Sequence, residues 1–403
     1  MNKIENIKAT QILDSRNKKA LEVSVFSSGK AGVFKVPSGA STGVHEALEL
    51  RDNDGSLNTA VLNIENQIKN KLLGLDVLDQ KNIDEVLIEL DNTKNKINLG
   101  GNAMIGASIA NLKLGSSLLE IPTYKYIQNI NNLANPKSTP YLYLNLINGG
   151  KHANNNLAFQ EYHIVPITKD PNEAIRIGLS IMNSLKSMLS LKFNSIPYGD
   201  EGGFAPPLNF IREPLFLLKH AIEENKLENK VRIALDVAAS SFYQDGYYLV
   251  DGVKLNSNQL LKLYEEIIAE FKIYSIEDPF HEEDFDSFRI LKNKYHDLIV
   301  VGDDLTVTNK QRLEQAIKSD SINALIIKPN QIGTITETFE TINLALRNNI
   351  KIIVSHRSGE TLDDFIADLA YAYNAFGLKS GAPTKPERLV KYNRLINIIK
   401  ENE

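Results

Sequence analysis

Three acidic residues each stand at the end of a short apolar run in the second half of the sequence: Asp236, Glu277 and Asp303. An acid at the end of a strand often caps the next turn or helix, and for any one of them that is the simpler interpretation. If the runs are strands of one barrel, however, their carboxyl ends meet at one mouth and the carboxylates become neighbours. A cation relieves the repulsion in such a cluster. Oxygen ligands without His or Cys favour Mg²⁺, with Mn²⁺ as a substitute.

Two lysines, Lys328 and Lys379, end later apolar runs. A lysine there is commonly a solvated charge on the rim, but beside a metal and another cation its pKa can fall, which makes it a usable general base. Arg357 follows another apolar run and lies between His356 and Ser358. Its planar guanidinium suits a phosphate or a carboxylate, and a surface salt bridge is the alternative interpretation.

Glu201 lies in a glycine-rich segment, residues 199–206, in which flanking glycines permit tight turns and hold an acid at a defined place. Glu161, at the start of a predicted strand over residues 162–166, is its candidate partner. Two neighbouring carboxylates raise the pKa of one of them, which gives an acid able to protonate a leaving hydroxyl near neutral pH. A turn with an exposed Glu explains the same motif. The loop residue His152 is more readily structural than catalytic.

The spacing of these charged residues predicts the elements that position them. From Glu277 through residues 303, 328, 356 and 379 the intervals are 26, 25, 28 and 23 residues. One strand, one loop and one helix need about that many residues, and their repetition implies parallel strands. Several such units predict a TIM-like (β/α)8 barrel, typically of about 250 residues. A doubly wound open sheet is the alternative, but its Gly-rich phosphate fingerprint and the Walker A pattern are both missing from the sequence.

The chain before the barrel has a different pattern. Residues 1–128 predict a smaller α+β domain, residues 129–140 are rich in Asn and Pro and predict a linker, and residues 141–403 predict the barrel domain. Alternating apolar residues predict a strand over 21–26, and a loop of small residues follows at 37–43. Helical spacing recurs in four segments, which are residues 60–73, 83–90, 103–119 and, within the barrel domain, 258–272.

Composition limits the class of protein. The chain has 403 residues, 42% of them hydrophobic and 24% charged, which is typical of a globular protein with more than one core. A net charge of −5 argues against a nucleic-acid partner. The absence of cysteine excludes disulfides and thiolate sites and fits a cytoplasmic location. No signal-peptide pattern begins the chain, and no apolar run approaches the roughly 18 residues of a membrane span.

The motifs resemble the enolase family, and the resemblance runs in order along almost the whole chain. The matching segments are Pro37–Gly43, Glu46–Asp52, Asn148–Gly150, Gln160–Glu161, Gly199–Pro206, Ser275–Phe280, Gly302–Asn309, Lys328–Gly333, Ser355–Thr361 and Lys391–Asn393. The resemblance implies a phosphopyruvate hydratase that reversibly dehydrates 2-phosphoglycerate to phosphoenolpyruvate in glycolysis and gluconeogenesis. It also implies a cytoplasmic homodimer or larger homo-oligomer. Some family members are also reported at cell surfaces, a location that this sequence does not address.

The resemblance further implies a role for each candidate residue. Lys328 would take the proton from C2 of the substrate, and Glu201, supported by Glu161, would assist departure of the C3 hydroxyl. The metal ligands would be Asp236, Glu277 and Asp303 for a first Mg²⁺, and Ser41, on a closing loop, for a second. The remaining substrate contacts would come from His152, Gln160, Glu161, His356, Arg357, Ser358 and Lys379, of which Arg357 and Ser358 would hold the phosphate.

Two other functions are compatible with a barrel of this kind. A cycloisomerase or racemase of the wider superfamily typically carries a Lys-x-Lys base on the second barrel strand, where this chain has Glu201 between glycines. A non-catalytic paralogue would be expected to lose some of the costly charges, and this chain keeps all of them. The chain departs from the family pattern at Asn17–Lys19, after Asp52, and at Ser241 and Leu362, which bears on the subunit interface and spares the chemical positions.

Overall fold

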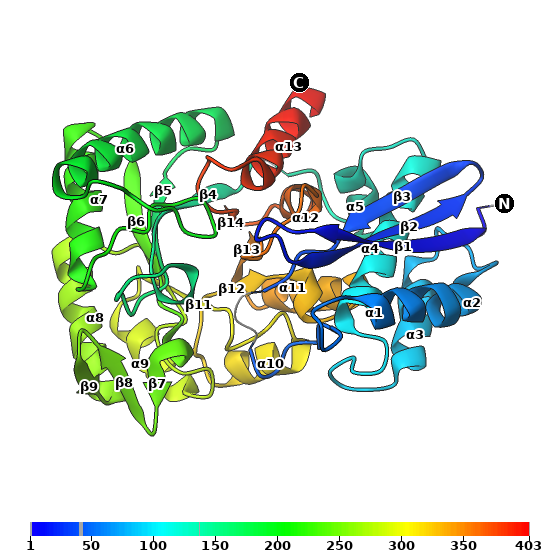
Figure 1. Ribbon diagram of the computed structural model, residues 1–403, viewed down its shortest axis with the longest axis horizontal. Coiled ribbons are helices and arrows are strands. Elements are labelled where there is room, and N and C mark those ends of the chain that lie inside the picture. The colour runs from blue at the N-terminus through cyan, green and yellow to red at the C-terminus, as the bar shows by residue number, and fades with distance from the viewer. Residues whose placement is uncertain (1, 40–42, 137, 403) are drawn as a thin grey trace.

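The computed structural model describes residues 2–39, 43–136 and 138–402. Its N-terminal part, at the right of Figure 1, contains an antiparallel sheet in the order β1-β2-β3. The strands are β1 (Asn6–Leu13), β2 (Lys19–Ser27) and β3 (Lys30–Lys35). The helices that pack beside this sheet are α1 (Asn58–Leu62), the π-helical turn Asn63–Ile68, α2 (Lys69–Leu72), α3 (Gln80–Asp91), α4 (Gly101–Leu118) and α5 (Thr123–Asn131). The predicted strand over 21–26 and the predicted helices over 60–73, 83–90 and 103–119 are confirmed. The first residues of the segment predicted as a linker belong to α5.

The close packing of β3 on α4 depends on Gly32. A Cβ at this position would lie 2.1 Å from the Ala110 carbonyl oxygen and 2.3 Å from the Leu114 backbone nitrogen. We therefore expect Gly32→Ala to lower the free energy of unfolding by about 3 kcal/mol, the upper range for overpacking a core. Chemical denaturation followed by circular dichroism measures the effect. Gly55→Ala is the control, because its φ of +79° is strained but its surroundings are open; an equal loss in both variants would contradict the packing argument.

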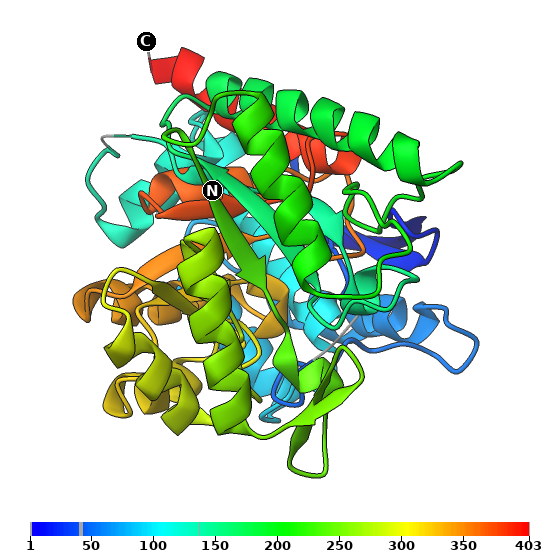
Figure 2. The same ribbon diagram turned by 90° about the vertical axis from the view of Figure 1, so that its left-hand side faces the viewer.

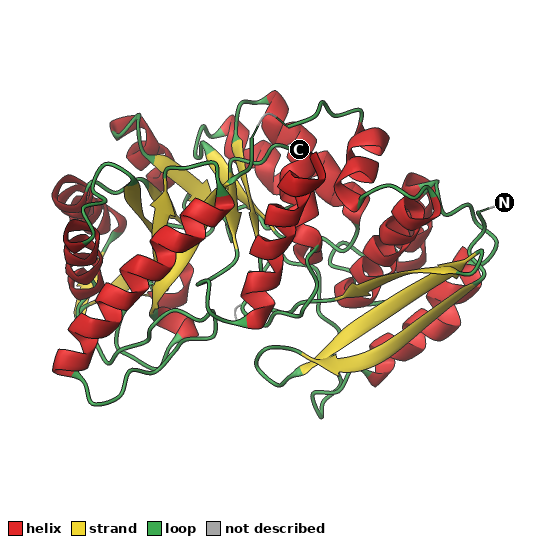
Figure 3. Cartoon of the chain, turned by 90° about the horizontal axis from the view of Figure 1, so that it is seen from above, coloured by secondary structure: helices red, strands yellow, loops and turns green. Residues whose placement is uncertain are grey.

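The C-terminal part is a closed barrel in the strand order β10-β11-β12-β13-β14-β4-β5-β6, which confirms the predicted fold class. The barrel strands are β4 (Tyr141–Asn148), β5 (Glu161–Pro166), β6 (Val231–Asp236), β10 (Ser275–Glu277), β11 (Ile299–Gly302), β12 (Ala324–Ile327), β13 (Lys351–Ser355) and β14 (Gly377–Lys379). Figure 3 shows these strands in yellow inside a ring of helices. A small three-stranded sheet outside the barrel consists of β7 (Tyr243–Gln244), β8 (Tyr247–Val250) and β9 (Val253–Leu255).

One barrel strand departs from the parallel arrangement that the spacing implied. β5 pairs antiparallel with both β4 and β6. The connection from β4 to β5 contains only the single 3₁₀ turn Gly150–His152 and no crossover helix, so the chain reverses direction. As a result the first residue of β5, Glu161, lies at the barrel mouth opposite the last residue of β6, Asp236.

Helices cover the outside of the barrel, as Figure 2 shows from the barrel side. They are α6 (Pro171–Lys192), α7 (Arg212–Glu224), α8 (Ser257–Phe271), α9 (Phe285–Lys294), α10 (Lys310–Lys318), α11 (Ile335–Arg347), α12 (Phe365–Ala372) and α13 (Pro386–Asn402). The predicted helix over 258–272 is α8. It begins at a capping box between Asn256 and Gln259 and ends where Lys272 adopts a left-handed conformation. Among the described residues, no helix is long and apolar enough to cross a membrane.

The barrel interior is filled by apolar side chains from alternate positions of its strands. These are Tyr143, Val165, Ala234, Ile299, Val301, Ala324, Ile326 and Ile353. Because this plug is dry, the charged residues gather at the mouth, where the strands end. The N-terminal part covers that mouth: Ser38 exchanges two backbone hydrogen bonds with Gly359, and the Ala47 backbone N–H donates to the Gln331 carbonyl.

Candidate active site

The predicted site residues meet in one cavity at the barrel mouth. Register places Glu277 opposite Asp236 and Ser355 opposite Lys379, so the strands end at one level. The cavity is lined by Gly39, Glu46, His152, Gln160, Glu161, Glu201, Asp236, Ala238, Asp278, Asp303, Asp304, Lys328, Ser355, His356, Arg357, Ser358 and Lys379. Glu277 lies directly beneath, in contact with Lys379. Segments from every part of the barrel therefore contribute charge to one enclosed space.

Lys379 is the centre of the first group of charges. Its side chain is 2% exposed, and its Nζ lies 2.8 Å from Asp236 Oδ2, 2.9 Å from Glu277 Oε2 and 3.4 Å from Glu161 Oε2. Burial disfavours its charge, but these carboxylates outweigh burial and raise the pKa of Lys379 well above its ordinary value. Burial and the neighbouring Asp236 raise the pKa of Glu277 in turn. One ammonium group thus compensates only part of the negative charge around it.

Lys328 forms a second pair with Asp303. Its Nζ donates to Asp303 Oδ2, and Gln331 Nε2 donates to Asp303 Oδ1 at 3.1 Å. The side chain of Lys328 is 14% exposed, so it faces the cavity. The sequence interpretation expected a lowered lysine pKa beside a bound metal, and this stays a prediction for the metal-bound site. Burial and two nearby cations favour the neutral amine, but the adjoining Asp303 carboxylate outweighs them and raises the pKa of Lys328.

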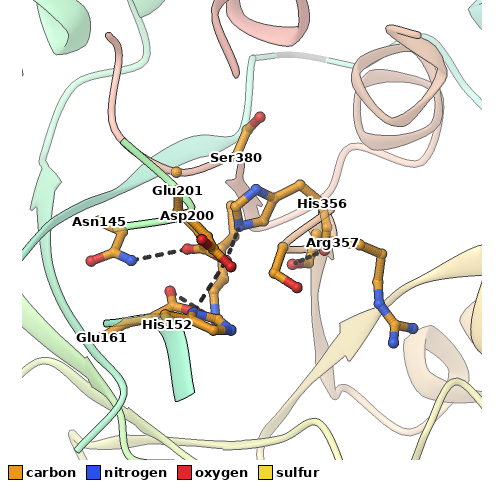
Figure 4. A network of polar contacts seen from close by, with 12 residues as sticks. Asn145, His152, Glu161, Asp200, Glu201, His356, Arg357 and Ser380 are labelled. Carbon is orange, nitrogen blue, oxygen red and sulfur yellow. Dashed lines mark hydrogen bonds and ion pairs between the residues drawn. The ribbon is translucent and has the colours of Figure 1, made fainter. Parts of the chain in front are cut away.

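Glu201 forms a third group with two histidines, drawn in Figure 4. Its Oε1 lies 3.4 Å from His152 Nδ1 and 3.3 Å from His356 Nε2, and Asn145 Nδ2 donates to its Oε2 at 2.9 Å. His152 Nδ1 is also 3.2 Å from Glu161 Oε1, so Glu161 and Glu201 share it. The predicted pairing of the two acids is therefore present in the structure.

The expected rise in the pKa of Glu201 is not observed. Burial and the neighbouring Glu161 raise this pKa, but the two histidines outweigh them and lower it below the ordinary value. Burial would also raise the pKa of Glu161, yet Lys379, His152 and His163 hold it well below its usual range. The two carboxylates by themselves would raise the pKa of one of them. The histidines that reverse the shift come from separate segments of the chain.

The segment that carries Glu201 is held by the connection between β14 and α13. The Ala382 backbone N–H donates to the Glu201 carbonyl at 2.9 Å, and Thr384 Oγ1 donates to the Gly202 carbonyl at 2.9 Å. Gly202 has a φ of +84° and Gly381 a φ of +73°, and a Cβ on Gly381 would lie 2.6 Å from the Glu201 carbonyl oxygen. Glycine is required at both positions for this close approach.

Arg357 connects the barrel to the N-terminal part. Its Nη1 lies 2.9 Å from Glu46 Oε2 and donates to Asn330 Oδ1 at 3.3 Å. The next residue, Ser358, accepts at its Oγ from Arg16 Nη1 at 3.3 Å. Arg16, from the opposite end of the chain, therefore contacts the residue next to Arg357. The arrangement suits a doubly charged anion such as a phosphate.

The predicted metal ligands are only partly brought together. Asp236 and Glu277 share Lys379, whereas Asp303 pairs with Lys328. Within the described ranges, two groups have ligand atoms that all lie within 4.8 Å of one another: Asp278, Asp303 and Asp304, and His152, Glu161 and Glu201. Ser41 lies outside the described residues. These carboxylates are buried, and Asp236 and Glu277 have raised pKa values and share one ammonium group. In its donor chemistry the set fits a hard divalent cation.

Several residues of the site escaped the sequence interpretation. Glu46, Asp278 and Asp304 stand inside or beside quoted motifs, and their positions next to known candidates could have revealed them. Asn145 is on β4, 56 residues before Glu201 in the sequence, and no local pattern connects the two. Arg388, which contacts His356, is in the first turn of α13, where a helix-surface arginine is the ordinary interpretation.

Both parts of the chain match the two domains of one protein family. Residues 4–127 match the family described as "Enolase, N-terminal domain", and residues 136–403 match "Enolase, C-terminal TIM barrel domain". A protein named Enolase from Methanocaldococcus jannaschii is 46% identical, over 99% of this chain and 95% of its own. One from Methanosarcina mazei is 47% identical, over 98% and 94%. One from Campylobacter lari is 44% identical, over 99% and 98%.

Proposed function

The chain belongs to the enolase family, and on that premise we propose how its own residues dehydrate 2-phosphoglycerate to phosphoenolpyruvate. It is a phosphopyruvate hydratase, a lyase that acts on a small molecule. The observation that carries the proposal is the separation of two proton-handling groups. Lys328 follows β12, and Glu201 contacts Asn145 of β4, which is three strands away in the closed order of eight, so the two groups lie on different sides of the mouth. A base and an acid on two sides of a substrate suit removal of a proton and a hydroxyl from adjacent carbons.

Lys328 is the base. A proton beside an ionised carboxylate is very weakly acidic, because its removal creates a second negative charge on the substrate. Lys328 takes the proton from C2 at Nζ as a neutral amine, a form that would be favoured once a cation compensates Asp303 in its place. The ammonium of Lys379 and the guanidinium of Arg357 contribute fixed positive charge nearby. Divalent cations held by Asp236, Glu277 and Asp303 would supply the remaining positive charge.

Glu201 is the acid that assists loss of the C3 hydroxyl. Its carboxyl group has a histidine on each side and an amide donor at its other oxygen, so its orientation is fixed. The carboxylate of Glu161 contacts His152 and so helps to position the carboxyl group of Glu201. Fixed orientation matters because proton transfer requires hydrogen-bond reach between the acid and the leaving oxygen.

Arg357 and Ser358 bind the phosphate, and His152, Gln160, Glu161, His356 and Lys379 complete the substrate contacts. In the structure described here Glu46 neutralises Arg357. A phosphate dianion competes for the same guanidinium and has more acceptor oxygens than a carboxylate. The reacting end of the substrate is then fixed between Lys328 and Glu201 by binding energy at the remote end.

Family membership implies a divalent metal, and we infer two Mg²⁺ ions, with Mn²⁺ as a substitute. Asp236, Glu277 and Asp303 would hold the first, and Ser41 would contribute to the second. The support is chemical: all donors are oxygen, the acids are buried, and burial raises the pKa of both Asp236 and Glu277. A divalent cation removes the cost of ionising them together.

Removal of metal is expected to abolish turnover and Mg²⁺ to restore it. Glu277→Gln should raise the Mg²⁺ concentration for half-maximal activity by more than about 10-fold, because even outer partners of metal ligands are worth 10- to 100-fold. Titration calorimetry with Mg²⁺ gives the binding constant without turnover. Glu224→Gln, at an exposed position on α7, is the matched control. Unchanged Mg²⁺ affinity in Glu277→Gln would contradict the ligand assignment.

The proposed setting follows the family. The division into residues 1–128, 129–140 and 141–403 is supported by family matches that end at 127 and resume at 136. We propose a cytoplasmic homodimer or larger homo-oligomer acting in glycolysis and gluconeogenesis. Purified protein with Mg²⁺ and 2-phosphoglycerate should produce the ultraviolet absorbance of phosphoenolpyruvate. A folded protein without turnover under these conditions would refute the function.

A further inference from the structure

Arg388 occupies an unusual place for an arginine. It is in the first turn of α13, where the helix dipole opposes a positive charge, and it is 0% exposed. Among the residues that the structure describes, the carboxylate paired with it is that of Glu387, which lies 3.7 Å from its Nε, beyond a normal hydrogen bond. A buried cation without a hydrogen-bonded carboxylate is costly, and an apolar side chain of similar volume would often be tolerated better. The position therefore calls for a reason other than stability.

The guanidinium of Arg388 faces the ring of His356. Its Nη1 donates to His356 Nδ1 at 2.5 Å and to the Arg357 carbonyl at 2.7 Å. Its Nη2 donates to the carbonyls of Ser358 at 2.6 Å and Asp200 at 3.1 Å. The fully buried guanidinium thus contacts both residues 356–358 and the segment that carries Glu201.

The direction of the hydrogen bond to His356 is determined by chemistry. A guanidinium has only donors and remains protonated in proteins, so Nδ1 of the imidazole must be the acceptor. A ring nitrogen that accepts carries no proton, and the single proton of the neutral ring is then on Nε2. Nε2 makes no hydrogen bond among the described residues, and Glu201 Oε1 is a carboxylate oxygen that lies 3.3 Å from it.

We propose that Arg388 is a positioning residue that locks His356 in the neutral tautomer with its proton on Nε2, aimed at the carboxyl group of Glu201. This inference rests on the proposed role of Glu201 for its catalytic consequence, but the tautomer itself does not depend on that role. Glu201 then has two unlike histidine neighbours. One stays neutral and serves only as a donor, and the other can carry charge.

The electrostatic surroundings of the two histidines support this contrast. Burial lowers the pKa of His356, Glu201 and the more distant Glu161 oppose that shift, and the charge of Arg388 adds to it, with a net lowering. Burial also disfavours the charge of His152, but Glu201, Glu161 and Asp236 outweigh burial and raise its pKa. Arg388 is the cation that faces one ring and not the other. A neutral His356 lies beside Glu201 without forming a second ion pair with it.

A solely structural role is the competing explanation, since Arg388 also binds three carbonyl groups. Such a role predicts lower stability or a lower rate at every pH, with no effect on the protonation of His356. The two explanations therefore differ in a spectroscopic property and in a pH profile. Neither of those readouts moves when an arginine only supports the backbone.

The first experiment uses the full-length protein labelled with ¹⁵N in its 7 histidines. His356→Gln assigns the signal of His356. Near neutral pH the wild type should show an unprotonated Nδ1 and a protonated Nε2. In Arg388→Met, Nδ1 should take up a proton at a pH at which the wild-type ring is neutral. A wild-type His356 that carries its proton on Nδ1, or an unchanged ring in Arg388→Met, would overturn the proposal.

The second experiment compares the pH dependence of kcat. Arg388→Met should move the acidic limb upward by about 1 to 3 pH units, the usual effect of a charge at this distance. Arg388→Lys keeps a permanent cation and donor and should restore the wild-type limb and tautomer. Arg394→Met is the control, because Arg394 is on the same helix and pairs with Asp368. A uniform loss of rate across pH in Arg388→Met would refute the lock. If that variant does not fold, the wild-type spectrum and Arg388→Lys decide.

Discussion

Lys328→Ala is expected to lose turnover by about 10²- to 10⁴-fold, the usual contribution of a positioned general base. The variant keeps the cavity, the three carboxylates and the phosphate-binding residues, so the loss should fall mainly on kcat. Formation of phosphoenolpyruvate by ultraviolet absorbance measures it. Lys318→Ala, an exposed lysine at the end of α10, is the matched control and should leave the rate unchanged.

Isotope exchange separates this role from simple damage to the site. In deuterated water the wild type should exchange the C2 proton of 2-phosphoglycerate, because abstraction by Lys328 is reversible. Lys328→Ala should lose this exchange together with turnover. Circular dichroism and a thermal transition verify the fold, since Asp303 loses its ammonium partner in the variant. Retention of exchange at the wild-type rate would exclude Lys328 as the base.

Glu201→Gln should reduce turnover by a similar factor of about 10² to 10⁴ while exchange at C2 persists. Glutamine matches the shape of glutamate and keeps an oxygen for the Asn145 amide, but it carries no acidic proton. Loss of the C3 hydroxyl should therefore fail after the C2 proton has been removed by Lys328. Both rates are measured in one reaction in deuterated water, by absorbance and by mass spectrometry of the remaining substrate.

The contrast between the two variants tests the division of labour across the mouth. Glu224→Gln, at an exposed position on α7, should show wild-type turnover and exchange. If Glu201→Gln lost exchange as completely as Lys328→Ala, Glu201 would be needed for removal of the C2 proton, and the two proposed roles would be wrong. Wild-type exchange at C2 together with lost turnover in Glu201→Gln is the pattern that the proposed roles predict.

The barrel and the ends of its strands were predictable from the sequence. Several of these strands are apolar runs that stop at a polar residue, because the apolar interior of the barrel meets its polar mouth at that point. The runs that end at Asp236, Glu277 and Lys379 are strands that end at those residues in the structure. Repetition at intervals of 23 to 28 residues was sufficient to indicate parallel strands with crossover helices.

The direction of β5 was decided by the fold. A run of apolar residues has the same pattern in either strand direction. Only the antiparallel pairing of β5 with β4 and β6 shows that this strand is reversed. The reversal brings Glu161, its first residue, to the mouth. A reading that counted only the final residues of strands would have placed that acid at the opposite end of the barrel.

The sequence by itself determined which residue types could do chemistry, their order along the chain and their positions at strand ends. The charge states were decided by tertiary structure. The expected rise in the pKa of Glu201 was wrong in direction, because two histidines outweigh the neighbouring carboxylate. At Lys328 the adjoining Asp303 carboxylate raises the pKa, and the expected fall depends on a bound metal. A pKa depends on burial and on charges within a few ångströms, and the chain brings those charges together from distant segments. Arg388 and His356, 32 positions apart, are one such pair.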